Sequence, residues 1–330
     1  MKKSLIALAA LAAVTTASAQ STVALTGVYS FSYQTDLTNT AANGALVTVN
    51  SARGGTAAAA AATNIDGQGF AVTDAALKLA AVEDLGGGLK ASFDYTLETG
   101  NFRGAPATRA DSGMAVSGGF GSVAMRNTRH SDLLASIASP AISLPDSLYD
   151  GLGILSRSGI DTVSYTAPTI SGFTASVTYA EGNDGAIDLP TTNAKSSSIF
   201  GVNYANGPLS ATVAIKASSL GAGSTVKKNQ NELAVSYDLG VAKVGFAYDD
   251  KTATASTDKS ASGYSITVPV GAVSFGAQMF KRGVLKQTDF GVSYAFSKRT
   301  ILSAAAGKLA GHATAENNGN QSRIKLSHSF

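Results

Sequence analysis

The final eight residues of the chain, 323–330, alternate almost perfectly between polar and apolar side chains up to the last position. Ile324, Leu326 and Phe330 fall two or four places apart, and Lys325, Ser327 and Ser329 occupy the alternate positions between them. A period of two puts successive side chains on opposite faces of a β-strand, so one face meets an apolar environment and the other meets water. A strand that closes on an aromatic residue is unusual for a soluble domain, and we expect a transmembrane β-barrel.

The other end of the chain predicts export. Lys2 and Lys3 precede a short apolar run at 5–14, and small residues up to Ala19 form a cleavage site. The apolar run is far shorter than the roughly 20 residues that a membrane-spanning helix needs. We therefore expect residues 1–19 to be a cleaved signal peptide and residues 20–330 to form one outer-membrane β-barrel domain.

The shortage of charge supports the same class. Charged residues make up 14% of the chain, against roughly 25% in soluble domains. A barrel explains the difference, because alternate residues of each strand face lipid. The absence of cysteine excludes disulfides, thiol catalysis and cysteine metal sites. The formal charge of +3 gives no indication of a nucleic-acid partner.

Segments with a period of two recur along the chain and predict about sixteen strands. Short links alternate with long polar ones, as expected for a barrel with short periplasmic turns and long extracellular loops. The predicted fold class is therefore an all-β, antiparallel transmembrane barrel. The predicted strands are 22–34, 70–84, 89–99, 108–118, 122–128, 161–169, 173–180, 196–206, 209–218, 232–239, 241–249, 262–270, 272–281, 288–296, 300–309 and 321–330.

Several collinear segments carry a family resemblance. They are STVALTGV at 21–28, EDLGGGLKA at 83–91, SGGFGSV at 117–123, VSYTAP at 163–168 with SGF at 171–173, YAFSKRT at 294–300, and LSHSF at 326–330. In this order they resemble strand and turn motifs of the beta-proteobacterial, neisserial-type general porins of Gram-negative bacteria. The resemblance implies a trimeric, 16-stranded, water-filled pore, with Phe330 serving as an assembly signal.

Charged residues on the polar phase of the strands are candidates for the pore lining. A lysine or arginine that faces lipid near the midplane costs about 2–4 kcal/mol, so these residues are expected to face the lumen. A wet lumen also tolerates charges that have no role in transport, and each residue is equally well explained as a solvated wall residue. The candidates are Lys78, Asp94, Glu98, Arg109, Asp111 and Arg126.

The link at about 130–160 is expected to fold inward and narrow the pore. It follows the fifth predicted strand, where porins of the resembled type fold a loop into the lumen. Asp132, Asp146 and Asp150 lie in it, and Arg157 lies near its exit. Acids facing basic wall residues would create a transverse field that favours polar solutes. The alternative is a surface loop with solvated acids.

The basic cluster departs from the resembled pattern. Ala76 and Ser164 occupy positions where porins of that type usually carry a basic residue, and Arg126 is followed by Asn127 and Thr128 instead of glutamine. We therefore expect only weak ion selectivity, with a lean towards anions.

These features predict passive diffusion of ions and small hydrophilic solutes. A solute-specific channel of the same fold, or a non-conducting barrel that serves as an adhesin or anchor, are the alternatives. The chain has three histidines, His130, His312 and His328, and no spacing of His, Asp and Glu that is typical of a catalytic or metal site. We therefore expect neither enzymatic activity nor a cofactor. The expected partners are two further copies of the chain, outer-membrane lipid and lipopolysaccharide.

Overall fold

The computed structural model describes most of the chain after its first twenty residues. The described residues are 21–38, 68–98, 108–131, 133–144, 157–181, 194–220, 229–250, 260–311 and 318–330. No helix among them is long and apolar enough to cross a membrane.

Sixteen strands and one short 3₁₀ helix make up the fold. The helix, η1, spans Leu133–Ile137. The strands are β1 (Thr22–Thr38), β2 (Gln68–Gly86), β3 (Leu89–Glu98), β4 (Thr108–Gly118), β5 (Gly121–Ser131), β6 (Arg157–Thr166), β7 (Phe173–Glu181), β8 (Ala194–Asn206), β9 (Leu209–Leu220), β10 (Asn229–Asp238), β11 (Lys243–Asp249), β12 (Ala261–Val270), β13 (Val273–Arg282), β14 (Leu285–Ala295), β15 (Thr300–Ala310) and β16 (Gly319–Ser329).

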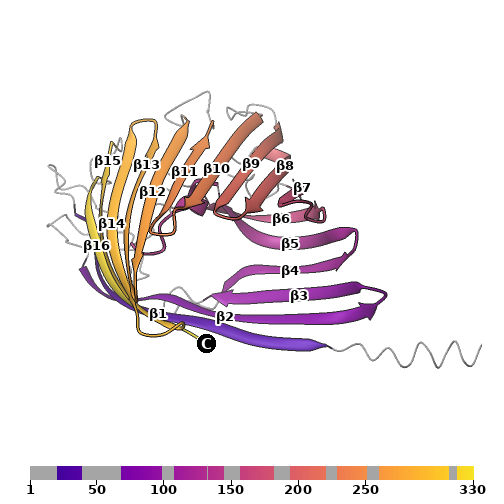
Figure 1. The fold of residues 1–330 in the computed structure, drawn as a ribbon, viewed down its shortest axis with the longest axis horizontal. Coiled ribbons are helices and arrows are strands. Elements are labelled where there is room, and N and C mark those ends of the chain that lie inside the picture. Colours follow the sequence, from indigo (N-terminus) through magenta and orange to yellow (C-terminus); the bar gives the residue numbers. More distant parts are fainter. Residues whose placement is uncertain are drawn as a thin grey trace, which may run out of the picture.

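The strands form one closed antiparallel barrel. Each strand pairs with its neighbours in the sequence, and β1 closes the ring by pairing with β16 (Figure 1). The structure confirms the predicted fold class, and each of the sixteen predicted segments overlaps one strand. Closure satisfies the backbone hydrogen bonds of every strand within the sheet, which is the requirement for crossing hydrocarbon with strands.

Alternation sorts the side chains as the sequence predicts. In β3 and its partners, Phe93 lies directly opposite Ala81 and Met114, and both large side chains are exposed on the outer face. In β1 the intervening residues Ser30 and Ser32 are buried on the inner side. The outer face is therefore apolar and the inner face polar, the reverse of a soluble sheet protein.

The two rims differ in their connections. At one rim the links are short, such as Gly119–Phe120 between β4 and β5 and Gly271–Ala272 between β12 and β13. At the other rim most links are long, as predicted. The link between β13 and β14 departs from this pattern, because Gly283 and Val284 alone complete it, and Gly283 has a φ of 60°.

The seam between β1 and β16 ends in a close contact on the outer face. Gly27 and Phe330 exchange two backbone hydrogen bonds of 3.0 Å. The Phe330 ring lies over Gly27, and a Cβ at that position would come within 2.8 Å of Phe330 Cε1 and 2.9 Å of the Ala76 carbonyl oxygen. Glycine at position 27 is therefore needed for the ring to cover the seam.

We predict that Gly27→Ala weakens the closed barrel. The added methyl displaces the Phe330 ring, at a cost of about 1–3 kcal/mol for overpacking. The folded barrel and the unfolded chain migrate differently on a gel, so the temperature of this mobility shift measures the effect. Gly119→Ala is the matched control, since a Cβ there meets nothing within 4 Å. Equal shift temperatures for the two variants would contradict the role of the contact.

Candidate functional site

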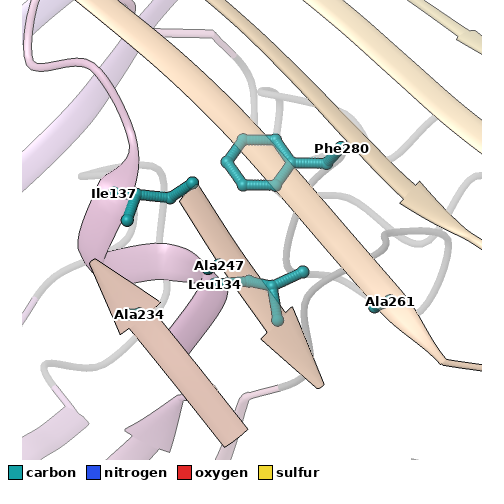
Figure 2. Packing of buried hydrophobic residues seen from close by; sticks show 6 residues of the cluster. All are labelled: Leu134, Ile137, Ala234, Ala247, Ala261 and Phe280. Atoms are coloured by element: carbon teal, nitrogen blue, oxygen red, sulfur yellow. The ribbon is translucent and has the colours of Figure 1, made fainter. Parts of the chain in front are cut away.

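The segment after β5 folds into the barrel and packs on the opposite wall. Residues 133–144 leave the end of β5, and η1 contacts β10, β11 and β12 on the far side of the ring. Leu134 is fully buried and Ile137 nearly so, and they pack with Ala234, Ala247 and Phe280 (Figure 2). These wall residues lie on the inner face of the barrel, so we call 133–144 the inner loop segment.

Glycines on five successive strands make the bed for this segment. A Cβ on Gly245 would come within 2.8 Å of Ile137, and one on Gly291 would come within 2.5 Å of the Ala141 carbonyl oxygen. For a Cβ on Gly276, the nearest atoms all belong to the segment. A Cβ on Gly263 or Gly307 would collide with a wall residue as well as with the segment. The five glycines, which we call the glycine row, are Gly245, Gly263, Gly276, Gly291 and Gly307.

Polar contacts fix the segment on this bed. The Ser139 amide donates to Gln278 Oε1 at 3.0 Å, and the Ser139 and Thr267 hydroxyls lie 2.6 Å apart. Further along, Arg323 Nη1 donates to the Leu144 carbonyl oxygen at 2.8 Å. Contacts at Ser139 and Leu144 hold both the middle and the end of the segment, so it is attached to the wall rather than projecting freely.

A buried carboxylate lies beside this attachment. Asp289 has no exposed surface. Gln278 Nε2 donates to its Oδ2 at 2.9 Å, and Gln287 Nε2 lies 3.1 Å and 3.0 Å from its two oxygens. Gln278 therefore links the Ser139 amide to the Asp289 carboxylate and uses both ends of its own amide group.

The wall formed by β2, β3 and β5 carries an exposed charged cluster. Arg126 donates to both oxygens of Asp94, at 2.9 Å and 2.8 Å. Lys78 Nζ lies 3.6 Å from Asp94 Oδ2. The side chains of Lys78 and Arg126 are 49% and 34% exposed, and that of Asp94 is 17% exposed. Two cations thus face water around one largely covered anion, and this part of the lumen is basic.

Two further basic residues lie towards the seam, but both are largely covered, and the side chain of Asp74 beside them is 42% exposed against 18% for that of Lys325. Lys325 on β16 forms a 3.2 Å ion pair with Asp74 on β2. Arg323, also on β16, donates from Nε to Gln34 Oε1 at 2.8 Å. Arg323 also binds the inner loop segment, so this one residue connects the segment to the seam between β1 and β16.

In its described part, the opposite wall carries two buried ion pairs besides Asp289, whose hydrogen-bond partners are the two glutamines. Lys216 Nζ lies 2.7 Å from Glu232 Oε1, and the two side chains are 3% and 1% exposed. Arg282 Nη2 lies 3.3 Å from Asp249 Oδ2. Gln230 Nε2 donates to Asp249 at 2.9 Å. Burial demands such pairing, because an uncompensated charge away from water is costly. These charges neutralise one another and leave the exposed cluster on the other wall as the stronger field.

The structure brings together three of the candidate pore-lining residues, Lys78, Asp94 and Arg126. Glu98 lies near the long-link end of β3, and Asp111 lies in β4. Arg109 pairs directly with Leu97, after a register shift that follows Tyr95. Arg157 begins β6 and pairs with Ser131. The side chains of Arg109 and Arg157 lie outside the described residues, and so do Asp132, Asp146 and Asp150 entirely.

Sequence alternation places Lys216 on the polar phase, opposite Val213 and Ile215, but sequence reasoning missed its partners in the charged network of the wall under the loop. Glu232 and Asp249 stand at the ends of predicted strands, where their phase already pointed inward. Arg282, Gln287 and Asp289 fell near or beyond the predicted strand ends. Extending the alternation past each predicted end was the available signal. The described residues include no group of three or more His, Asp or Glu side chains arranged for a metal.

Comparisons with known proteins agree on the fold. Residues 6–314 match the family model described as Gram-negative porin. An anion-selective porin from Comamonas acidovorans has a similar structure, with a TM-score of 0.66 and 20% identity over 94% of this chain and 100% of that one. A triple mutant of Rhodopseudomonas blastica porin gives a TM-score of 0.62 at 12% identity with the same coverage. No curated protein sequence matches the chain.

We predict that Gly291→Ala displaces the inner loop segment. The new Cβ would collide with backbone atoms of Ala141 and Ile142, which side-chain rotation cannot relieve. The segment then moves off its bed into the lumen, at a cost of about 1–3 kcal/mol, and narrows the passage. Recordings in planar bilayers should give a smaller conductance step than the unsubstituted chain. Gly119→Ala again serves as control, and an unchanged step for Gly291→Ala would contradict the packing.

Proposed function

The chain belongs to the Gram-negative porin family, and on this premise we propose that it acts as a trimeric diffusion pore with a weak preference for anions. The family and fold support an outer-membrane channel for ions and small hydrophilic solutes, and the proposal involves no catalytic step or cofactor. Each copy of the chain encloses its own passage, and solutes cross it passively between the inner loop segment and the basic wall.

The observation that carries the proposal is the placement of the inner loop segment inside a closed ring. A wall of sixteen strands encloses a lumen too wide for its own side chains to fill. The segment rests against β10–β15, and the exposed cations Lys78 and Arg126 lie on another part of the wall. A passage bounded by a fixed loop and a charged wall suits polar solutes.

The preference for anions follows from exposure rather than from the number of charges. Lys78 and Arg126 are more exposed than Asp94 between them, while two ion pairs of the opposite wall are buried. Fixed cations in a narrow passage raise the local concentration of anions. The anion selectivity named for the Comamonas relative supports this reading. The exposed acid Asp74 opposes it, and we propose the same of Asp132, Asp146 and Asp150, which keeps the preference weak.

The remaining expectations complete the proposal. We propose that residues 1–19 are removed on export, that Phe330 is an assembly signal, and that the barrel contacts lipopolysaccharide as well as lipid. The position of Phe330 on the outer face of the seam supports the second point. A solute-specific channel would show conductance blocked by one class of solute, and a plugged adhesin or anchor would conduct nothing.

We predict that Lys78→Gln moves the selectivity of the pore towards cations. The substitution removes the most exposed cation of the charged cluster, so the reversal potential in a salt gradient should shift in the cation direction. Lys286→Gln is the matched control, because it removes the same charge from the outer face of the barrel. A strong cation preference of the unsubstituted chain would refute the proposed lean, and equal shifts for both variants would refute the role of Lys78.

A further inference from the structure

Three lysines gather on the outer face of the barrel near its long-link rim. Lys281 and Lys286 lie directly opposite each other across β13 and β14. Lys308 on β15 pairs with Thr288, which places it diagonally from Lys286. All three are exposed, and each is followed in the sequence by a buried inner residue: Arg282, Gln287 and Leu309. We call these three lysines the lysine triad.

The described residues provide no counter-ion for the triad. Like charges directly opposite each other destabilise a strand pair. No ion pair recorded among the described residues involves the triad. Asp289 on β14 faces inward and accepts hydrogen bonds from Gln278 and Gln287. Asp250, just after β11, accepts two hydrogen bonds from Asn231. The described acids nearby in the sheet are therefore committed elsewhere.

The surroundings of the triad indicate what kind of anion would fit. On the side towards the barrel middle lie exposed apolar side chains, including Phe275, Phe290 and Ile324. On the side towards the rim, Gly283 and Val284 complete the hairpin, so no long loop between β13 and β14 covers the lysines. A positive patch at the edge of an apolar belt fits a ligand with phosphate groups at one end and acyl chains at the other.

We propose that the lysine triad binds the phosphate groups of a phosphorylated glycolipid in the outer leaflet of the outer membrane. The acyl chains of this lipid lie along the apolar side chains below the triad. The inference rests on the proposed function in one respect: it takes the long-link rim as the extracellular side. It goes further by assigning the contact with lipopolysaccharide to one face of the barrel, β13–β15. It also attributes that contact to electrostatic attraction rather than to nonspecific hydrophobic contact.

Binding of purified lipids tests the proposal. The mature chain in detergent is titrated with diphosphoryl lipid A, with dephosphorylated lipid A and with inorganic phosphate. We expect the diphosphoryl lipid to bind tightest. The Lys281→Gln/Lys286→Gln variant should lose about tenfold in affinity for it, since two solvent-exposed ion pairs disappear, and should bind the dephosphorylated lipid unchanged. Lys298→Gln/Arg299→Gln is the matched control, because it removes two exposed charges from the short-turn rim.

Each other outcome overturns the proposal. Equal affinity of the variant and the control for diphosphoryl lipid A, or equal binding of the two lipids by the unsubstituted chain, would exclude a phosphate site at the triad. Inorganic phosphate binding as tightly as the lipid would indicate a simple anion site. Loss of the oligomer in the triad variant would indicate that another copy of the chain covers this face. Conductance of the same samples is recorded in parallel: a silent pore refutes the proposed function and leaves the lipid result standing.

Discussion

The structure depends on closure of the sheet. A strand that crosses hydrocarbon must have all its backbone donors and acceptors paired, and a ring of strands is the arrangement that leaves no edge. Here the ring closes where β1 meets β16, and the contact of Gly27 with Phe330 completes that seam on the lipid side. Once the ring is closed, alternation sends every second side chain to lipid and the others to the lumen.

The inner loop segment occupies part of the lumen that the closed sheet encloses. Its attachment uses the absence of side chains as much as their presence: the glycine row lets the backbone of 139–144 approach the wall, and Gln278 and Arg323 then fix it by hydrogen bonds. Buried ion pairs beneath the loop neutralise each other, whereas Lys78 and Arg126 stay in contact with water. Position within the ring, more than net charge, therefore decides which residues act on a passing ion.

Much of this fold is predictable from sequence, because strand period and link length are local properties. The sixteen segments, the outward phase of Phe93 and the inward phase of Asp94 all follow from alternation. The register shift between Tyr95 and Leu97, which decides what Arg109 lies beside, does not, since a bulge depends on the partner strand. The glycine row was also invisible. Its members lie on five strands, and only the three-dimensional register aligns them under one segment.

Accessibility of single cysteines along β3 tests the alternation most directly, because the chain contains no cysteine of its own. Asp94→Cys and Thr96→Cys should react with a water-soluble, membrane-impermeant thiol reagent in reconstituted membranes. Phe93→Cys, Tyr95→Cys and Leu97→Cys should react only with a lipid-soluble reagent. Uniform labelling along the strand, or water-soluble labelling confined to the odd-numbered positions, would contradict a lipid-facing wall around a hydrated lumen.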